Sequence, residues 1–216
     1  MKTNVLPILL VLFLSCQSDK TAKEQTQIQA ENPVASPMAK SKPEAWIADA
    51  TPSILFLGGD LSVAKGLLPE EGYVEGLKTK ILEKGYQGRV INAAIAGEPL
   101  AGLLERLPLL MEQPVEVVVL EMGQMDEKRQ LEPTLFEKQA SALFTALLKQ
   151  VPAHRILVLN TAAQPTYQAL VENKCKDLTI KVIDLKAKPG KADKKHHLEQ
   201  VHTIWPVLKN LLPPEM

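Results

Sequence analysis

The chain has 216 residues, of which 45% are hydrophobic and 23% are charged, and its 25 basic side chains balance its 25 acidic ones. This balance argues against nucleic acid as the main partner, because nucleic-acid-binding proteins usually carry a basic excess or a basic stripe. With 2 cysteines, Cys16 and Cys175, the chain has neither a disulfide framework nor a zinc site made of cysteines alone.

Residues 1–15 have the layout of a secretory signal peptide, with a basic start, an apolar run from Val5 to Leu14 and a small residue before Cys16. This apolar run is too short to span a bilayer. The sequence Phe13-Leu14-Ser15-Cys16 resembles a loose bacterial lipobox, in which the cysteine is acylated and becomes the first residue of the mature protein. We therefore expect a lipid anchor at Cys16. An ordinary signal peptide that is cleaved elsewhere is the alternative.

Residues 16–50 are expected to form a flexible tether. They are rich in Gln, Ala, Lys, Ser and Pro, with almost no large apolar side chain before Trp46. Such a segment cannot bury enough apolar surface to offset its ordering entropy, so it would hold a globular domain off a membrane. Gln17 replaces the aspartate of an inner-membrane retention signal, which favours an exported protein on the periplasmic side of the outer membrane. Residues 51–213 are then long enough for one domain with one core.

Short strands are expected along this domain. The first, Ser53-Ile54-Leu55-Phe56-Leu57, stops at Gly58-Gly59, which is typical of a buried strand that ends in a tight turn. The others are expected at residues 89–92, 115–121, 155–160 and 178–185. The run from Val117 to Leu120 is continuously apolar, as in the strands of a parallel sheet that is covered on both faces.

Helical patterns separate these strands. Tyr73, Leu77 and Ile81 form one apolar helical face. The clearest helix is expected over residues 133–151, where Pro133 suits the first turn. Its apolar stripe consists of Phe136, Ala140, Leu143, Phe144, Leu147 and Val151. The alternation of strands and helices predicts a three-layer α/β/α sandwich, whose site lies outside the carboxyl ends of the strands.

Polar motifs follow these strands. The first reads Leu57-Gly58-Gly59-Asp60-Leu61-Ser62, and the next two read Asn92-Ala93-Ala94-Ile95-Ala96-Gly97-Glu98 and Gly123-Gln124-Met125-Asp126. The last reads Asp193-Lys194-Lys195-His196. In this order the motifs resemble the first, second, third and fifth blocks of the SGNH (GDSL-type) hydrolases. Gly66-Leu67, Glu71-Gly72-Tyr73 and Trp205-Pro206 continue the match to bacterial arylesterases and thioesterase I-type lysophospholipases.

The resemblance implies a flavodoxin-like fold with a five-stranded parallel sheet, and ester hydrolysis that needs no cofactor or metal. It also implies that Asp193 orients His196 as the base and that Gly97 donates its N–H to the oxyanion. Three positions depart from the pattern. Asp60 stands where the family has its catalytic serine, and Gly59 stands where it has the aspartate before that serine. Met125 stands where the family has an asparagine that donates to the oxyanion. Loss of the serine costs about 10⁶ in turnover, and loss of one donor about 10²–10³.

We therefore expect a pseudoenzyme, whose pocket survives as a binding or docking site for an acyl-ester or glycan-like ligand. The alternative is an active acyl hydrolase in which Asp60 is the nucleophile beside His196 and Asp193. A purely structural envelope protein is a third class.

Several residues have a simpler interpretation beside the functional one. Asp60 suits the N-cap of a helix as well as a catalytic role. Ser62 is expected as a polar first-turn residue rather than a displaced nucleophile. Cys175, between two lysines, is expected as a surface thiol.

The histidines near the C-terminus also have two interpretations. His196, His197 and His202 with Asp193 match no standard zinc spacing, so we expect solvated side chains. The lysine-rich segment from Lys186 to Lys195 is expected as a solvated loop, with contact to anionic head groups as the alternative.

Overall fold

The computed structural model describes residues 51–185 and 193–213, so the predicted signal peptide, the predicted tether and most of the lysine-rich segment lie outside the described residues. The elements run in the order β1 (Ser53–Leu57), η2 (Pro69–Glu71), α1 (Tyr73–Glu83), β2 (Arg89–Asn92), α2 (Leu100–Leu110), β3 (Val115–Met122), α3 (Gln124–Lys128), α4 (Pro133–Leu147), η3 (Ala153–Arg155), β4 (Ile156–Asn160), α5 (Pro165–Asp177), β5 (Lys181–Asp184) and α6 (Lys194–Leu208).

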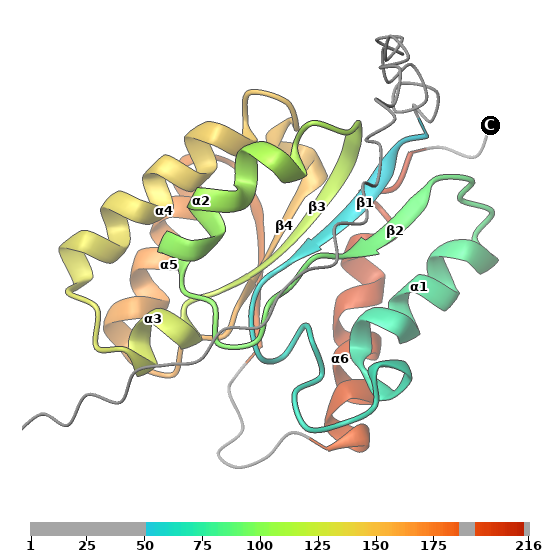
Figure 1. The fold of residues 1–216 in the computed structure, drawn as a ribbon, viewed down its shortest axis with the longest axis horizontal. Helices are drawn as coiled ribbons and strands as arrows, with labels where there is room; N and C mark the ends of the chain where they lie inside the picture. Colours follow the sequence, from blue (N-terminus) through green and yellow to red (C-terminus); the bar gives the residue numbers. More distant parts are fainter. Residues whose placement is uncertain (1–50, 186–192, 214–216) are drawn as a thin grey trace, which may run out of the picture. The chain divides into compact units, whose positions relative to one another are not determined.

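The strands form one parallel sheet in the order β2-β1-β3-β4-β5 (Figure 1). In β1, Ile54 pairs with Val90 of β2 and with Val117 of β3, so β1 lies inside the sheet. Parallel neighbours need a crossover between them, and here each crossover includes a helix. The predicted fold class, a three-layer sandwich around a five-stranded parallel sheet, is confirmed.

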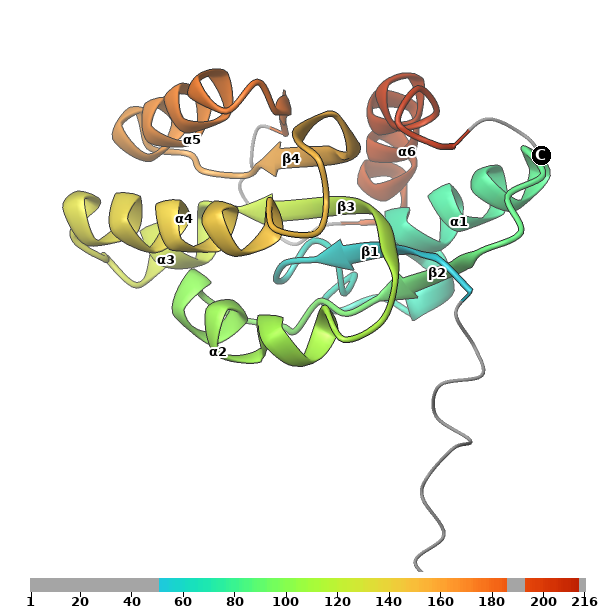
Figure 2. The same cartoon turned by 90° about the horizontal axis from the view of Figure 1, so that it is seen from above.

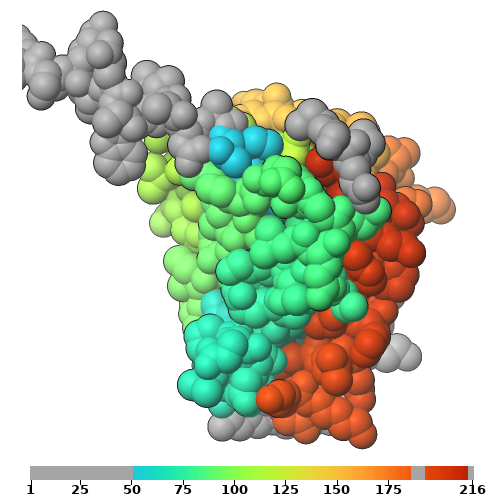
Figure 3. All heavy atoms as spheres, turned by 90° about the vertical axis from the view of Figure 1, so that its right-hand side faces the viewer, coloured from blue at the N-terminus to red at the C-terminus, as the bar shows by residue number. Residues whose placement is uncertain are grey.

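Each face of the sheet has its own layer of helices (Figures 1 and 2). Successive side chains of a strand point to opposite faces. Leu55 and Leu57 therefore pack in the core under α2, α4 and α5, whereas Ile54 and Phe56 pack in the core under α1 and α6. Figure 3 shows the second layer from outside, with α1 and α6 side by side. In residues 51–185 and 193–213, no helix combines the length and the apolar character needed to cross a membrane.

Two predicted elements are shorter in the structure. The helix predicted over 133–151 ends at Leu147, although Val151 is still fully buried. The strand predicted from residue 178 begins at Lys181, because α5 continues to Asp177 and a turn follows. Thr179 has a φ of 54° in that turn, and Ile180 N–H donates to the carbonyl of Cys175 at 2.8 Å. The apolar side chains of Leu178 and Ile180 in this turn resemble the end of a strand when only the sequence is read.

The prediction that Cys175 is a surface thiol is wrong. Its side chain is completely buried in the core under α5, and the exposed lysine that follows it points the other way. Burial raises the pKa of the Cys175 thiol to about 12. A helical cysteine between polar residues can still face the sheet, because neighbouring helical positions lie on different sides.

Candidate active site

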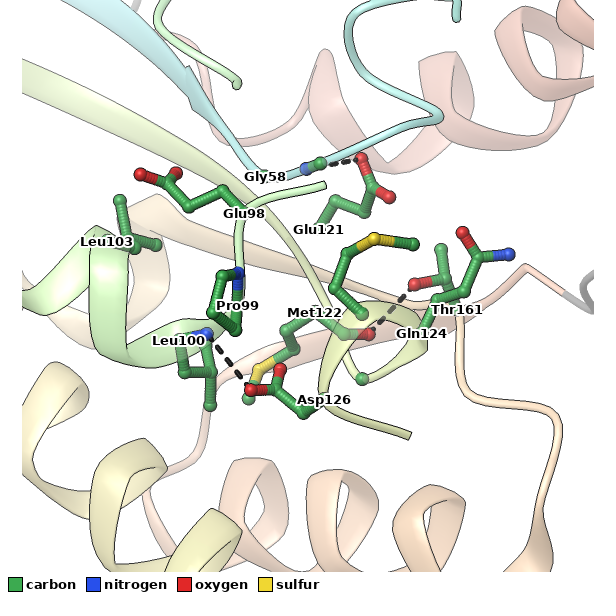
Figure 4. A pocket seen from close by; sticks show the side chains of 13 residues that line it. Gly58, Glu98, Pro99, Leu100, Leu103, Glu121, Met122, Gln124, Asp126 and Thr161 are labelled. Atoms are coloured by element: carbon green, nitrogen blue, oxygen red, sulfur yellow. Dashed lines mark hydrogen bonds between the residues drawn. The ribbon is translucent and has the colours of Figure 1, made fainter. Parts of the chain in front are cut away.

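The segments that follow β1, β2 and β3 meet at one edge of the sheet, where these strands end. The chain order reverses here, because β2 lies on one side of β1 and the later strands lie on the other. Ligands of open α/β sheets bind in the crevice outside the carboxyl ends of the strands at such a reversal. Figure 4 shows this edge, with Gly58 after β1, Glu98 before α2 and Glu121 of β3 around one small pocket.

Asp60 lies at this edge with its carboxylate between a backbone N–H and two lysines. Oδ1 accepts a hydrogen bond from Gly97 N–H at 2.8 Å. Oδ2 forms ion pairs with Lys65 Nζ at 3.1 Å and with Lys128 Nζ at 3.7 Å. The side chain is 16% exposed. The structure therefore brings together two of the predicted site residues, Asp60 and Gly97, in direct contact.

The prediction that Asp60 caps a helix is wrong. Residues 60–66 form turns, and the next helices are η2 and then α1, which begins at Tyr73. Ala64 has a φ of 54° and Gly66 a φ of 88°, which are left-handed conformations that a right-handed helix cannot contain. Because no helix starts beside Asp60, its carboxylate bonds to the loop after β2 instead.

The Gly97 peptide is held on both sides. Its N–H donates to Asp60, and its carbonyl accepts a hydrogen bond from Arg129 Nη2 at 2.8 Å. Its φ of 74° lies in the region that glycine adopts at low cost. The N–H that the resemblance assigns to the oxyanion hole is thus present and oriented, but it is bonded to the protein's own carboxylate.

Met125, near the start of α3, is buried beside Gly59. A Cβ atom placed on Gly59 would lie 3.0 Å from Met125 Cγ. Glycine at position 59 therefore leaves the room that the Met125 side chain needs. A thioether sulfur accepts hydrogen bonds weakly and donates none, so Met125 supplies no donor to an oxyanion. The departures at positions 59 and 125 are in contact with each other.

Glu121, at the end of β3, is the centre of a buried network that the motifs did not reveal. Its carboxylate accepts hydrogen bonds from Gly59 N–H at 3.1 Å, Leu61 N–H at 3.4 Å, Ser62 N–H at 2.8 Å and Ser62 Oγ at 2.6 Å. Ser62 Oγ also bonds to Tyr73 Oη at 2.7 Å. Burial raises the pKa of Glu121, and these donors partly oppose that effect. The sequence did hold one signal for this network, because Glu121 is an acidic residue at the end of an otherwise apolar strand pattern.

Ser62 was expected as a polar residue in the first turn of a helix, but residues 60–66 form turns and no helix begins there. The side chain is 2% exposed, and its hydroxyl lies between Glu121 and Tyr73. A hydroxyl enclosed in this way cannot meet a substrate without opening the loop. Ser62 therefore holds residues 59–62 against β3, and this fixes the position of Asp60.

Asp193 and His196 lie at the start of α6. Asp193 is the N-cap residue, and its Oδ1 accepts a hydrogen bond from the backbone N–H of His196 at 2.7 Å. His196 is 8% exposed, and both nitrogens of its ring lie 3.4 Å from Gln200 Nε2. The contact between Asp193 and His196 thus caps the helix and fixes its first turn.

The expectation of solvated histidines is wrong for His196 and His197, which both face the interior. His197 is 1% exposed, and its Nδ1 accepts a hydrogen bond from Tyr73 N–H at 3.2 Å. Because Nδ1 is the acceptor, the neutral ring carries its hydrogen on Nε2. Burial, and then the charge of the neighbouring His196, lower the pKa of His197. Among the described residues, no three His, Cys, Asp or Glu side chains are grouped in a way that could hold a metal ion.

The pocket at this edge is nearly filled. Its volume is about 10 Å³, which is roughly the space of one water molecule. The carboxylates around it already have partners, because Glu98 accepts two hydrogen bonds from Arg106, at 2.6 and 2.5 Å, and Asp126 accepts one from Leu100 N–H at 3.1 Å. This small pocket by itself is too small to hold an acyl chain.

The sheet order, the two helical layers and the placement of the blocks after β1, β2 and β3 and at the start of α6 define an SGNH-hydrolase type of α/β sandwich. No protein-family model matches the chain. The chain is 33% identical to Esterase TesA of Pseudomonas aeruginosa over 119 residues. These residues make up 55% of this chain and 58% of that protein. It is 28% identical to an arylesterase of Vibrio mimicus over 121 residues, and these residues make up 56% of this chain and 60% of that protein.

Solved structures extend the comparison over most of the domain. A crystal structure of TesA covers 74% of this chain and 99% of its own, with a TM-score of 0.64 and 24% identity. The structure of AlinE4, described as an SGNH-hydrolase family esterase, matches 76% of this chain and 97% of its own chain, with a TM-score of 0.55 and 23% identity. The predicted resemblance to the SGNH/GDSL hydrolases is confirmed, while the chain spans about three fifths of the curated relatives it matches.

Proposed function

We propose that this chain is a lipoprotein pseudoenzyme, in which an SGNH-type domain has lost ester hydrolysis and serves as a binding or docking domain. The observation that supports this proposal is the contact between the Asp60 carboxylate and Gly97 N–H. The resemblance implies that this N–H is the oxyanion donor, so we infer that the Asp60 carboxylate takes the position of the oxyanion of an ester.

The chemistry of ester hydrolysis explains why this contact matters. A serine nucleophile needs a hydroxyl proton that a histidine removes, and the developing oxyanion needs free N–H donors. An Asp60 carboxylate offers no proton to His196 and keeps the Gly97 donor occupied. Two like charges about 4 Å apart repel by roughly 4 kcal/mol at an effective dielectric constant of about 20. That repulsion corresponds to about 10³ in rate.

The other departures act in the same direction. Met125 removes a second donor, which costs about 10²–10³ in turnover in comparable sites. The nearly filled pocket beside Gly59 and Met125 also offers an acyl group no space of its own. These losses do not add in a simple way, but each of them lowers turnover.

An active ester hydrolase is the second candidate, because the curated relatives are esterases. In this mechanism Asp60 would attack the acyl carbon, the alcohol would leave, and water activated by His196 would hydrolyse the resulting anhydride, with Asp193 as the partner of His196. Asp60 would first have to leave Gly97 N–H and two lysines. These contacts stabilise the carboxylate and weaken it as a nucleophile, so we place this candidate second.

The proposed location follows from the sequence. Acylation at Cys16 would anchor the chain to membrane lipid, and Gln17 favours the periplasmic side of the outer membrane. The ligand that we propose for the docking domain is an acyl-ester or glycan-like group, since that is the chemistry on which the fold's blocks are built.

Turnover of p-nitrophenyl acetate and butyrate tests the loss of catalysis. We expect the wild type to remain at the background rate, with no change in Asp60→Ala or His196→Ala. Wild-type turnover that both substitutions abolish would refute the pseudoenzyme proposal and favour Asp60 as the nucleophile. Lys138→Ala, on the exposed face of α4, is the matched control.

A further inference from the structure

A second cavity lies at the opposite edge of the sheet from Asp60. It opens between Pro52 before β1, Tyr86 in the turn before β2, Glu116 near the start of β3, and Leu212 and Pro213 after α6. We refer to it as the amino-edge cavity. Its volume is about 370 Å³, compared with about 10 Å³ for the pocket at the candidate active site. Small-ligand sites usually have volumes of about 300–1,000 Å³, so this cavity is large enough for a small ligand.

The walls of the amino-edge cavity are held in place by hydrogen bonds. Tyr86 Oη donates to Glu116 Oε2 at 3.1 Å. A Cβ atom on Gly88 would come within 2.3 Å of Tyr86 Cζ, so glycine at position 88 lets the ring lie against the backbone. On the other side, Arg155 Nη1 donates to the Leu211 carbonyl at 2.5 Å, directly before Leu212. The cavity is therefore formed before any ligand binds.

The lining of this cavity is mostly apolar, with one carboxylate at its side. Glu116 is half-buried and uses Oε2 for Tyr86, while Oε1 has no hydrogen-bond partner among the described residues. Burial and the Glu116 charge raise the pKa of Tyr86, so the phenol stays neutral and donates. A half-buried carboxylate with a free oxygen is stabilised by a positively charged N–H donor. Lys84, which also lines the cavity, already has an interaction partner.

We propose that the amino-edge cavity binds a small aromatic amine, with the planar apolar group beside Tyr86 and Leu212 and the ammonium on Glu116. This site goes beyond the proposed function, because it shares no residue with the candidate active site and does not depend on the loss of hydrolysis. It assigns to this fold a ligand class that the esterase chemistry does not require.

Protein-observed NMR with tryptamine and indole-3-acetate tests the proposal. These probes share the indole ring and differ in the sign of their charge. We expect tryptamine to shift the amides of Gly85 and Gly88 in a saturable way and to bind about tenfold or more tightly than indole-3-acetate. Glu116→Gln should remove this preference, whereas Glu112→Gln, an exposed acid at the same edge, should keep it. Tyr86→Phe keeps the ring and frees the carboxylate, so tryptamine binding should persist.

Several results would overturn the proposal. The first is the absence of saturable shifts at probe concentrations up to about 10 mM. A preference for tryptamine that survives Glu116→Gln would show that this carboxylate is not the recognition group. Shifts centred on Gly97 rather than on Gly85 and Gly88 would place binding at the other edge.

Discussion

Restoring the missing groups of the hydrolase site should restore ester turnover. The variant combines Gly59→Asp, Asp60→Ser and Met125→Asn, which rebuilds the first and third blocks. Serine at position 60 releases Gly97 N–H, which now donates to Asp60 at 2.8 Å. Asparagine at position 125 adds a second donor. Gly97, Asp193 and His196 stay unchanged.

The magnitude follows from the terms that the structure identifies. Removing the carboxylate relieves a repulsion of roughly 4 kcal/mol toward an oxyanion, and each recovered donor is worth about 10²–10³ in turnover. A pocket that is not optimised will recover only part of this, so we expect turnover of p-nitrophenyl butyrate about 10²-fold or more above wild type. The additional substitution His196→Ala should abolish the gain. Asp60→Asn, which removes the charge without adding a nucleophile, should show none.

The stability of the same variants tests the packing argument. Gly59→Asp alone places a Cβ atom 3.0 Å from Met125 Cγ, and overpacking of this kind costs about 1–3 kcal/mol. Met125→Asn keeps a Cγ atom but replaces the longer thioether chain with a shorter amide that can donate to the new carboxylate, so urea unfolding should show a favourable coupling of about 0.5 kcal/mol or more between the two substitutions. A folded triple variant with neither coupling nor a gain in turnover would refute the assignment of positions 59, 60 and 125.

Three further predictions concern other parts of the chain. Glu121→Gln should lower the free energy of unfolding by about 2–4 kcal/mol, because the glutamine amide cannot accept hydrogen bonds from all the donors of residues 59–62. Urea unfolding measures this loss beside the exposed control Glu105→Gln, and an equal effect of the two substitutions would contradict the expectation. Folding lowers the pKa of His197 from its ordinary value of 6.5, so below that pH the unfolded chain binds more protons at this residue than the folded chain does. The stability that wild type gains over His197→Gln should therefore be complete above pH 6.5 and decline as the pH falls below 6.5. Unfolding at pH 7.5, 6.5 and 5.5 tests this expectation, and a stability difference that grows toward acid pH would refute it. The mature protein should begin at acylated Cys16, and mass spectrometry of the N-terminus that finds an unmodified peptide with another first residue would disprove the anchor.

The sequence predicted the architecture because periodicity and apolar runs are local signals. The strand at 89–92 and the apolar faces of α1 and α4 agree with the structure. The start of β5 was placed wrongly, since Leu178 and Ile180 continue the apolar pattern through the turn at Thr179 without continuing the strand. Cys175 was misplaced for a related reason, because its polar neighbours hid its orientation toward the sheet.

The site residues were harder to predict because their partners are distant in the chain. Position 60 was predicted to be the key departure from the SGNH pattern, but no local pattern reveals that its carboxylate reaches Gly97, 37 residues away. The N-cap interpretation failed because left-handed Ala64 prevents a helix there. His197 and Glu121 are buried through contacts with Tyr73 and with residues 59–62, which only the folded chain brings together.

Hydrogen exchange of the single Gly97 amide tests the central claim most directly. If the Asp60 carboxylate holds this N–H, exchange should be slow in the wild type and in Lys65→Met, which leaves the carboxylate in place. It should become markedly faster in Asp60→Ala, while the amides of β3 remain protected. Gly97 exchange that is already fast in the wild type, or that does not respond to Asp60→Ala, would show that the oxyanion donor is free and would contradict the account.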